Sequence, residues 1–385
     1  MKNILIIHQS AEMYGSDKTL LLFLSNLDLT KYNPVVILPN EGPLYQEIQK
    51  LKLPLYTAPV IKLYRDIFKP LNFLKFIFEI FKALFFIKKL DSQFKFDYIY
   101  SNTIAVLSGF LYASLFRKKH IWHVHEIIEK PTLIKNIFKF LLDRKTNYRI
   151  VFNSLQTQGF WSKEKKHIQS NGICIWNGLD LDRIPNVATE KKYQIKTELF
   201  QFNQSNLILG LVGRISSWKG HNLLLESFKI LIKEDPNLKL IFVGSYPPNQ
   251  EYFLSDLQNS IKESNLENDV HIVPFQSNIW EIWEAIDIAV VPSTEPEPFG
   301  MVAIEAMYAK KPVVAAKHGG LLEIVEENSS GLLFKPNDVF NLAEKLRTLT
   351  KNSELRIQLG EKGKEIVKEK FSISNHMNQF YKILN

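Results

Sequence analysis

Short apolar runs alternate along the first half of the chain with longer stretches in which apolar residues recur every three or four positions. The runs have the length of buried strands, and the stretches have the period of helices. The expected strands are Ile4–His8, Val35–Leu38, Tyr98–Ser101, His120–His123 and Ile150–Asn153. The expected helices include Thr19–Leu27, Leu44–Leu51 and Thr103–Leu115. This alternation predicts a parallel sheet covered by crossover helices.

The same alternation restarts after a break at Asn177–Val187, which contains Gly178 and Pro185. Strands are expected at Leu207–Val212, Leu238–Val243, Val270–Val273, Ala289–Pro292 and Val313–Ala315. Helices are expected at Gly220–Glu234, Tyr252–Ser264, Ile279–Ala285 and Val302–Tyr308, and residues 339–385 are mostly helical in pattern. Two such series predict an α/β protein with two Rossmann-like, doubly wound domains, residues 1–176 and 177–370.

Length, charge and cysteine content limit the partners and the cellular location to be expected, and they agree with the predicted fold. The 385 residues are too many for one ordinary core, and a net charge of +8 favours partners such as phosphorylated small molecules, anionic lipid or nucleic acid. The single cysteine, Cys174, excludes an intrachain disulfide framework. The N-terminal apolar run is too short for a signal peptide, and charges interrupt the apolar stretch Leu63–Leu90. A cytoplasmic location is therefore expected.

Two segments of the first half, Phe68–Leu90 and Thr132–Lys145, place large apolar residues beside regularly spaced lysines. This is the composition of a basic amphipathic helix that lies on an anionic membrane, on the inner face of the plasma membrane in this case. It is equally that of an ordinary amphipathic helix with a solvated lysine face. The sequence leaves both interpretations open.

The segment Pro292–Met307 has the densest chemistry in the chain. A rigid loop with three prolines in seven residues follows a strand, and Gly300 then opens a helix. Such a helix start offers unpaired N–H groups and partial positive charge to an anion. Glu297 precedes this helix and Glu305 lies inside it, so the two carboxylates can address two ends of one ligand.

Glu297 and Glu305 within Glu-Pro-Phe-Gly resemble the hallmark of the retaining GT-B glycosyltransferases of family 4. Val212-Gly-Arg214 followed by Lys219-Gly220 resembles that family's phosphate-binding element. Asn177-Gly-Leu-Asp180 resembles its interdomain signature, and His318-Gly-Gly320 with Glu323 its second glycine loop. The resemblance implies a GT-B fold with two Rossmann-like domains facing a cleft. It also implies that residues 371–385 form a helix returning to the first domain.

The resemblance also implies roles for individual residues. Arg214 and Lys219 would neutralise the donor diphosphate, Glu297 would hold sugar hydroxyls and Glu305 a ribose. Catalytic residues would be Glu297, His125, Arg214 and Lys219. The donor site would consist of Gly15, Gly213, Arg214, Lys219, Gly244, Glu297, Phe299, Gly300, Met301 and Glu305.

Acceptor-side candidates lie in the first half. The loop Ala11–Asp17 resembles the family's Gly-Gly-x-Glu loop, with Tyr14 at the first glycine and Asp17 at the acid. His123 and His125 alternate along a strand and so face one side, and Glu126 follows them. The acceptor-side candidates are Tyr14, Asp17, His123 and Glu126, while His125 matches the family's strand-end histidine.

The expected reaction is retaining transfer of a sugar from a nucleotide diphosphate to a hydroxyl of a glycan or lipid-linked glycan, in surface polysaccharide biosynthesis. No cofactor or metal is expected, because Asp180-Leu-Asp182 lies in the linker instead of ending a sheet strand. The alternatives are a GT-B epimerase or phosphorylase, and a non-catalytic glycan- or lipid-binding protein. Nucleic-acid binding is suggested by charge alone, and no recognised motif supports it.

Overall fold

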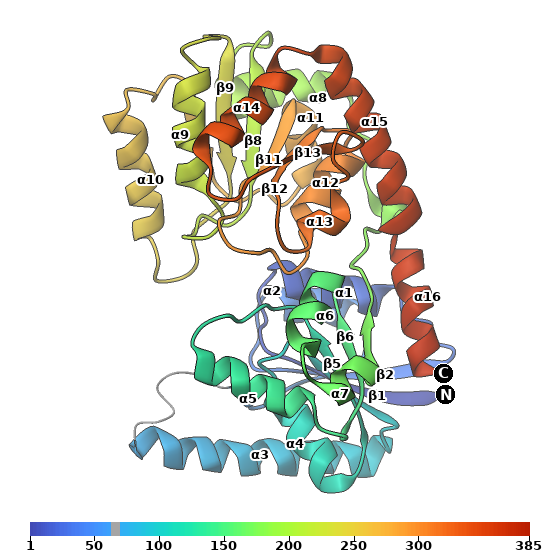
Figure 1. Cartoon of the computed structure of the whole chain (residues 1–385). Helices are drawn as coiled ribbons and strands as arrows, with labels where there is room; N and C mark the ends of the chain where they lie inside the picture. Colours follow the sequence, from blue (N-terminus) through green and yellow to red (C-terminus); the bar gives the residue numbers. More distant parts are fainter. Residues whose placement is uncertain (63–69) are drawn as a thin grey trace. The chain divides into compact units, whose positions relative to one another are not determined.

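The computed structural model describes residues 1–62 and 70–385 and divides them into two compact units. Unit 1 comprises residues 1–177 and 373–385, and unit 2 comprises residues 178–372 (Figure 1). Each unit contains one parallel sheet with helices around it. Among the described residues, no helix combines the length and apolar character needed to cross a membrane.

Unit 1 is built on a seven-stranded sheet with the order β3-β2-β1-β4-β5-β6-β7. Its strands are β1 (Lys2–His8), β2 (Tyr32–Leu38), β3 (Leu55–Thr57), β4 (Tyr98–Asn102), β5 (Lys119–Val124), β6 (Asn147–Phe152) and β7 (Gly172–Cys174). Its helices are α1 (Gly15–Ser25), α2 (Pro43–Lys50), α3 (Pro70–Phe94), α4 (Leu107–Phe116), α5 (Thr132–Leu142), α6 (Leu155–Ser162), α7 (Lys166–Asn171) and α16 (Ile373–Leu384).

The strands of unit 1 bury both faces, as parallel strands between two helix layers must. Ile4 and Ile6 of β1 pack in one cluster with α1, α2 and α16, whereas Leu5 and Ile7 pack in another with α3 and α4. The last helix contributes Phe380, which is fully buried, to the first of these clusters. The C-terminal segment is thus part of the core of unit 1.

Unit 2 repeats the arrangement with a six-stranded sheet of order β10-β9-β8-β11-β12-β13. Its strands are β8 (Leu207–Val212), β9 (Leu238–Val243), β10 (Val270–Val273), β11 (Ile288–Val291), β12 (Val313–Ala316) and β13 (Gly331–Phe334). Its helices are η2 (Leu181–Arg183), α8 (Thr189–Gln194), η3 (Ile195–Leu199), α9 (His221–Leu231), α10 (Tyr252–Glu263), α11 (Ile279–Ala285), α12 (Met301–Tyr308), α13 (Leu321–Ile324), α14 (Val339–Thr350) and α15 (Ser353–Lys370).

Both sheets have the doubly wound order in which the chain moves outward from a central strand and then returns to its other side. The reversal lies between β1 and β4 in unit 1 and between β8 and β11 in unit 2. The predicted α/β class and Rossmann-like topology are therefore confirmed. Ligands bind at such reversals, outside the carboxyl ends of the strands.

Three short strands, β3, β7 and β13, were not predicted, and two helix starts were misplaced. Helix α1 begins four residues earlier than expected because Asp17 and Tyr14 form a capping box at its start. Helix α4 begins at Leu107 instead of residue 103, because Thr103 adopts a left-handed conformation with φ of 88°. The first two residues of the predicted segment Phe68–Leu90 lie outside the described residues.

Candidate active site

The predicted donor residues of unit 2 gather at the carboxyl edge of its sheet. Gly213 and Arg214 follow β8, Gly244 follows β9, and the loop that carries Glu297 follows β11. Since β8 and β11 are neighbours, the two loops flank the position where the strand order reverses. The topology therefore brings separate sequence motifs to one place.

Glu297 is the most constrained carboxylate of this edge. Its Oε1 atom accepts hydrogen bonds from Lys219 Nζ and from Ser293 Oγ, both at 2.6 Å. The Lys219 ammonium also lies 4.2 Å from the centre of the Trp218 ring, a cation–π distance. The Oε2 atom makes no hydrogen bond to any described residue. One oxygen thus anchors the side chain, and the other remains available to a ligand.

The second glycine loop is the support on which the Glu297 loop rests. The Gly320 amide donates to the Glu297 carbonyl at 2.7 Å, and His318 Nε2 bonds the Ser293 carbonyl at 2.8 Å. Gly319 has a φ of +59°, and a Cβ atom there would overlap the backbone of Glu297. A residue with a side chain would therefore displace the carboxylate loop.

Helix α12 begins directly after this loop, with Gly300 as its N-cap residue. Met301 and Glu305 lie one turn apart on the same side of α12, and both are half-buried. Phe299 stays a prediction for the donor site, but its side chain points away from the sheet edge. That ring is 2% exposed and packs edge-on against Phe371 at 5.8 Å, so it belongs to the core of unit 2.

The remaining predicted residues of unit 2 lie in loops at the ends of β8 and β9 and in the linker. Arg214 is exposed at the end of β8. Gly244 acts through its lack of a side chain, because a Cβ atom there would overlap the carbonyl of Gly213. Asp180 occupies the N-cap position of η2, as the linker interpretation requires, and its carboxylate pairs with Arg183 Nε at 3.1 Å.

In unit 1 the corresponding edge holds a buried chain of polar side chains that the sequence analysis did not identify. His8 Nε2 donates to Asp17 Oδ1 at 2.6 Å, and Ser10 Oγ donates to the same oxygen at 2.8 Å. The Tyr14 amide donates to Asp17 Oδ2 at 2.9 Å. Burial alone would raise the pKa of Asp17, but these hydrogen bonds lower it below its usual value. Asp17 is 2% exposed and holds His8, so it does not face an acceptor as predicted.

Asn102 connects this pair to the predicted histidine. Its amide nitrogen lies 3.0 Å from His8 Nδ1, and its Oδ1 accepts from His125 Nε2 at 2.9 Å. His125 therefore carries its proton on Nε2 and leaves the Nδ1 lone pair as an acceptor. Burial, together with the nearby His8 and His376, lowers the pKa of His125 to about 3, so the ring is neutral at pH 7. Nδ1 has no hydrogen-bond partner among the described residues.

His123 and Glu126 both support His125, and the acceptor-side role of the half-buried Glu126 stays a prediction. The His123 ring is 1% exposed, lies 3.9 Å from the His125 ring centre to centre, and bonds the Tyr100 hydroxyl at 2.6 Å. Glu126 Oε2 accepts from the amides of His125 and Ile104 at 3.0 and 3.1 Å. Burial raises the pKa of Glu126 to about 7 against the opposing effect of these bonds.

The two other predicted residues of this edge lie where α1 begins. Tyr14 is the half-buried N-cap residue of α1, and Gly15 is exposed, with no atom within 4 Å of the position a Cβ would take. Gly15 therefore leaves the helix start open. In the described part of the chain, no three His, Cys, Asp or Glu side chains are grouped so that they could hold a metal ion.

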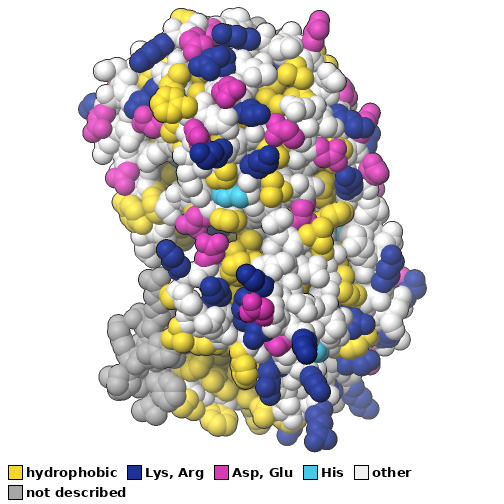
Figure 2. All heavy atoms as spheres, in the orientation of Figure 1, with side chains coloured by type: hydrophobic (Ala, Val, Ile, Leu, Met, Phe, Trp, Pro, Cys, Tyr) yellow, Lys and Arg dark blue, Asp and Glu magenta, His cyan; other side chains and the backbone are white. Residues whose placement is uncertain are grey.

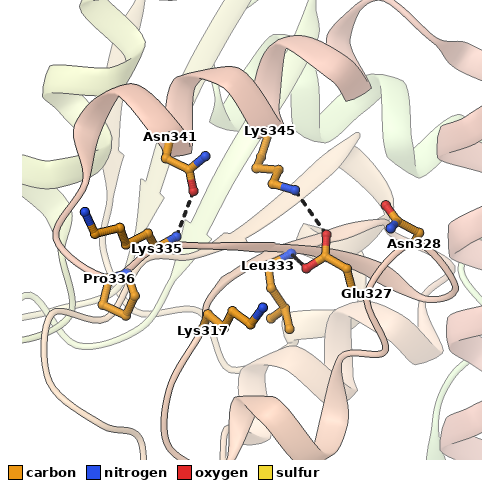
Figure 3. A pocket seen from close by; sticks show the side chains of 8 residues that line it. All are labelled: Lys317, Glu327, Asn328, Leu333, Lys335, Pro336, Asn341 and Lys345. Atoms are coloured by element: carbon orange, nitrogen blue, oxygen red, sulfur yellow. Dashed lines mark hydrogen bonds and ion pairs between the residues drawn. The ribbon is translucent and has the colours of Figure 1, made fainter.

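A pocket of unit 2 lies elsewhere, beside β12, β13 and α14 (Figure 3). This open pocket of about 480 Å³ is lined by Lys317, Glu327, Asn328, Leu333, Lys335, Pro336, Asn341 and Lys345. Its carboxylate is already engaged, because Glu327 bonds Lys345 at 3.1 Å and the Leu333 amide at 3.0 Å. None of the predicted donor residues lines it, so this pocket is not the predicted donor site.

Comparison with known proteins agrees with this arrangement. Residues 194–366 match the model of the family Glycosyl transferases group 1. The match covers less than half of the chain and lies within unit 2, so it is this unit that is similar to the family. The capsular polysaccharide biosynthesis glycosyltransferase CapM of Staphylococcus aureus is 29% identical over 55% of this chain, and the match spans 53% of CapM. The uncharacterized glycosyltransferase MJ1069 of Methanocaldococcus jannaschii is 25% identical over 92% of this chain and 87% of its own length.

Solved structures of similar proteins share this fold. The crystal structure of Anabaena HepE in complex with UDP and glucose has a TM-score of 0.85, with 23% identity over 100% of this chain and 99% of HepE. The predicted GT-B fold, with two Rossmann-like domains, is confirmed by such neighbours and by the two sheet orders.

Proposed function

We propose that this protein is a group 1 glycosyltransferase that moves a sugar from a nucleotide-diphosphate donor to a hydroxyl of a glycan or lipid-linked glycan. The proposal includes retention of the anomeric configuration and independence of metal ions. The observation that carries it is the Lys219–Glu297 pair at the carboxyl edge of the unit 2 sheet, directly before the start of α12. A cation, a helix N-terminus and a carboxylate with a free oxygen meet the needs of a diphosphate and a sugar.

The diphosphate leaving group needs positive charge that is already in position. Lys219 is held by Glu297 and Trp218, so its ammonium loses little freedom when a phosphate oxygen becomes its third partner. The first N–H groups of α12 and the exposed Arg214 add donors at the same sheet edge. Fixed cationic groups can thus replace the divalent metal that would otherwise neutralise the phosphates.

The state of the Glu297 carboxylate bears on the route that a retaining transfer would take. A double displacement needs a carboxylate that is free to attack the anomeric carbon. Oε1 of Glu297 already accepts from Lys219 and Ser293, which makes this group a poor nucleophile and a good anchor for sugar hydroxyls. We therefore favour a reaction on one face of the sugar, in which the departing phosphate takes the acceptor proton.

His125 would hold a hydroxyl group through its neutral Nδ1 atom. The Asp17–His8–Asn102 chain fixes the tautomer that leaves this atom unprotonated. Such an imidazole accepts a hydrogen bond from a sugar or acceptor hydroxyl without adding charge.

The donor and acceptor classes come from relatives. HepE was crystallised with UDP and glucose, and CapM is named for capsular polysaccharide biosynthesis. We propose a UDP-sugar as the first donor to test, and a surface polysaccharide or its lipid-linked precursor as the acceptor. An epimerase acting on the same donor is the alternative, as is a binding protein that lacks catalysis.

Thermal unfolding in the presence of nucleotides tests the donor site. A ligand at 100 times its dissociation constant adds about 2.7 kcal/mol, which raises the Tm of a unit of this size by roughly 5–10 °C. We expect UDP to produce this rise and Lys219→Ala to abolish it. Lys335→Ala removes an exposed lysine of the same unit from the pocket in Figure 3 and should leave the rise unchanged. A rise lost equally in both variants would contradict the assigned site.

Product analysis separates the remaining alternatives. Transfer to an added glycan acceptor, with the donor's anomeric configuration kept and full activity in a chelator, is the expected result. Conversion of the UDP-sugar to an isomer without an acceptor would identify an epimerase. Nucleotide binding with neither product would favour the non-catalytic protein, and inverted product would refute retention.

A further inference from the structure

Helix α3 has two apolar faces, and the core of unit 1 covers one of them. Ala83, Ile87 and Leu90 point inward and are at most 4% exposed. Phe78, Phe81 and Phe85 recur at helical spacing on the other side and are 59%, 67% and 75% exposed. A surface helix normally has a polar outer face, so three exposed phenylalanines on one stripe are unusual for a helix in water.

Basic side chains border this stripe. The Lys82 ammonium lies 4.8 Å from the centre of the Phe78 ring, and Lys88 lies 5.1 Å from the ring of Phe116 at the end of α4. Lys82, Lys88 and Lys89 are all exposed. Of the two acidic residues of α3, Asp91 is engaged with Lys118 at 2.8 Å, and Glu79 is half-buried. The outer face of α3, defined by Phe78, Phe81, Phe85 and Phe116 with these lysines, is thus both apolar and positive. On the surface in Figure 2, hydrophobic side chains gather over the α3 and α5 region with Lys and Arg beside them.

Charge is divided unequally between the two units. Unit 1 contains 26 Lys and Arg against 13 Asp and Glu, a net charge of +13, and unit 2 contains 22 against 27, a net charge of −5. The excess of +8 for the whole chain therefore comes entirely from the unit that carries the outer face of α3. A field of this sign attracts an anionic surface, and it opposes the approach of a second unit 1 to the same face.

We infer that the outer face of α3 is a docking surface for an anionic lipid bilayer. Phenylalanine rings enter the boundary between headgroups and acyl chains, while lysines at their edges keep their ammonium groups among the phosphates. Each such lysine contributes roughly a five-fold factor to binding. Each ring that leaves water contributes roughly ten-fold or more. The inference does not depend on the reaction that the protein catalyses.

Flotation of the full chain with vesicles tests the inference. We expect binding to vesicles of phosphatidylglycerol and phosphatidylcholine, weakened by added salt, and little binding to phosphatidylcholine alone. Phe81→Ser with Phe85→Ser should lower binding about 100-fold, and Lys82→Gln with Lys88→Gln about 25-fold. The matched control replaces two exposed aromatic residues of unit 2, Tyr252→Ser with Phe340→Ser, which are 53% and 77% exposed. It should bind as the native chain does.

Several results would overturn the inference. These are recovery of the native chain with the soluble fraction, equal binding to neutral vesicles, or unchanged binding of the double phenylalanine variant. A concentration-dependent dimer that this variant abolishes would identify a second copy as the occupant, and binding to duplex DNA at physiological salt would identify a nucleic acid. All replaced side chains are exposed, so an unchanged Tm and unchanged UDP binding should show that the variants are folded.

Discussion

Replacing Asn102 by aspartate should make the reaction sensitive to acid. Asn102 lies between two imidazoles, 2.9 Å from His125 Nε2 and 3.0 Å from His8 Nδ1. In the native protein the pKa of His125 is about 3, so its Nδ1 atom stays an acceptor at every pH used for assays. A carboxylate at position 102 would sit within hydrogen-bond distance of both rings and favour their protonated forms.

The size of the effect follows from the distance. An opposite charge within about 4–6 Å raises the pKa of a histidine by roughly 1–3 units, which moves His125 to roughly 4–6. Below this value Nδ1 carries a proton and cannot accept a hydroxyl hydrogen. The transfer rate should therefore fall about ten-fold for each pH unit below the new pKa, and recover at higher pH.

Asn147→Asp is the matched control because it makes the same change to another buried histidine. Asn147 Oδ1 lies 2.7 Å from His120 Nδ1, and burial lowers the pKa of His120 to about 4 against the effect of that bond. His120 is fully buried and bonds Ser101 through its other nitrogen, so its charge should not alter the reaction directly.

The assay is the pH dependence of kcat and KM for both variants, with histidine titration followed by NMR. We expect a new acid limb in Asn102→Asp alone. If NMR shows that the pKa of His125 has risen while the rate stays flat, His125 does not accept a hydroxyl. If both variants show the same limb, acid unfolding explains it and the assigned role of Asn102 is refuted.

Three further predictions concern the site, the backbone and stability. Ser293→Ala removes one of two donors to Glu297 Oε1 and should lower the rate about 10-fold, whereas Glu297→Gln should cost about 10²–10³-fold, measured as kcat/KM. Gly244→Ala should destabilise unit 2 by at least about 2 kcal/mol in urea unfolding, because Cβ would meet the Gly213 carbonyl, whereas Gly159→Ala in α6 has free space and should be neutral or stabilising. Acid should unfold unit 1 before unit 2, as hydrogen exchange at pH 5.5 against pH 7.5 would show. Each histidine with a lowered native pKa takes up a proton on unfolding. The stability of the folded unit is therefore unaffected by this histidine above its ordinary pKa of 6.5 and decreases as the pH falls below it. Among the described residues, the histidines with a lowered pKa are His120, His123, His125 and His376 in unit 1 and His221 in unit 2. Glu126 of unit 1 has a raised pKa and releases one proton on unfolding, so unit 1 takes up three protons net. The free energy of unfolding should therefore fall by about 4 kcal/mol per pH unit in unit 1 and by about 1.4 kcal/mol per pH unit in unit 2. Earlier exchange in unit 2 would contradict this order.

Much of the fold was predictable because long apolar runs and helical periods alternate twice. The positions of Glu297, Lys219 and Arg214 also followed, since each lies just after a strand and parallel strands end at one edge. Two of the missed strands, β3 and β7, contain only three residues each, too few for a period to be visible.

Side-chain direction was not predictable from the same patterns. His8 ends an apolar strand and gives no periodic signal, yet it is the residue that Asp17 holds. A carboxylate two residues after Gly15 fitted a loop facing a ligand, but the capping of α1 turns it inward. Phe299 lies between two residues of the site and still faces the core. Such directions depend on contacts between distant segments, as Asn102 beside His8 and His125 illustrates.

The net charges of the two units indicate that nucleotide binding and attraction to an anionic surface depend on different charged groups. Unit 2 holds the proposed diphosphate site yet has a net charge of −5, so its global field opposes an anionic donor. Affinity there must come from short-range groups, namely Lys219 at 2.6 Å from Glu297 and the N-terminus of α12. The +13 of unit 1 is therefore not needed to hold the nucleotide. An excess of charge that the reaction does not use, lying beside exposed phenylalanines, is best explained by a surface that the protein binds as a whole. Adding salt should for this reason weaken vesicle binding strongly, while UDP binding to unit 2, whose charges are in contact, should weaken far less.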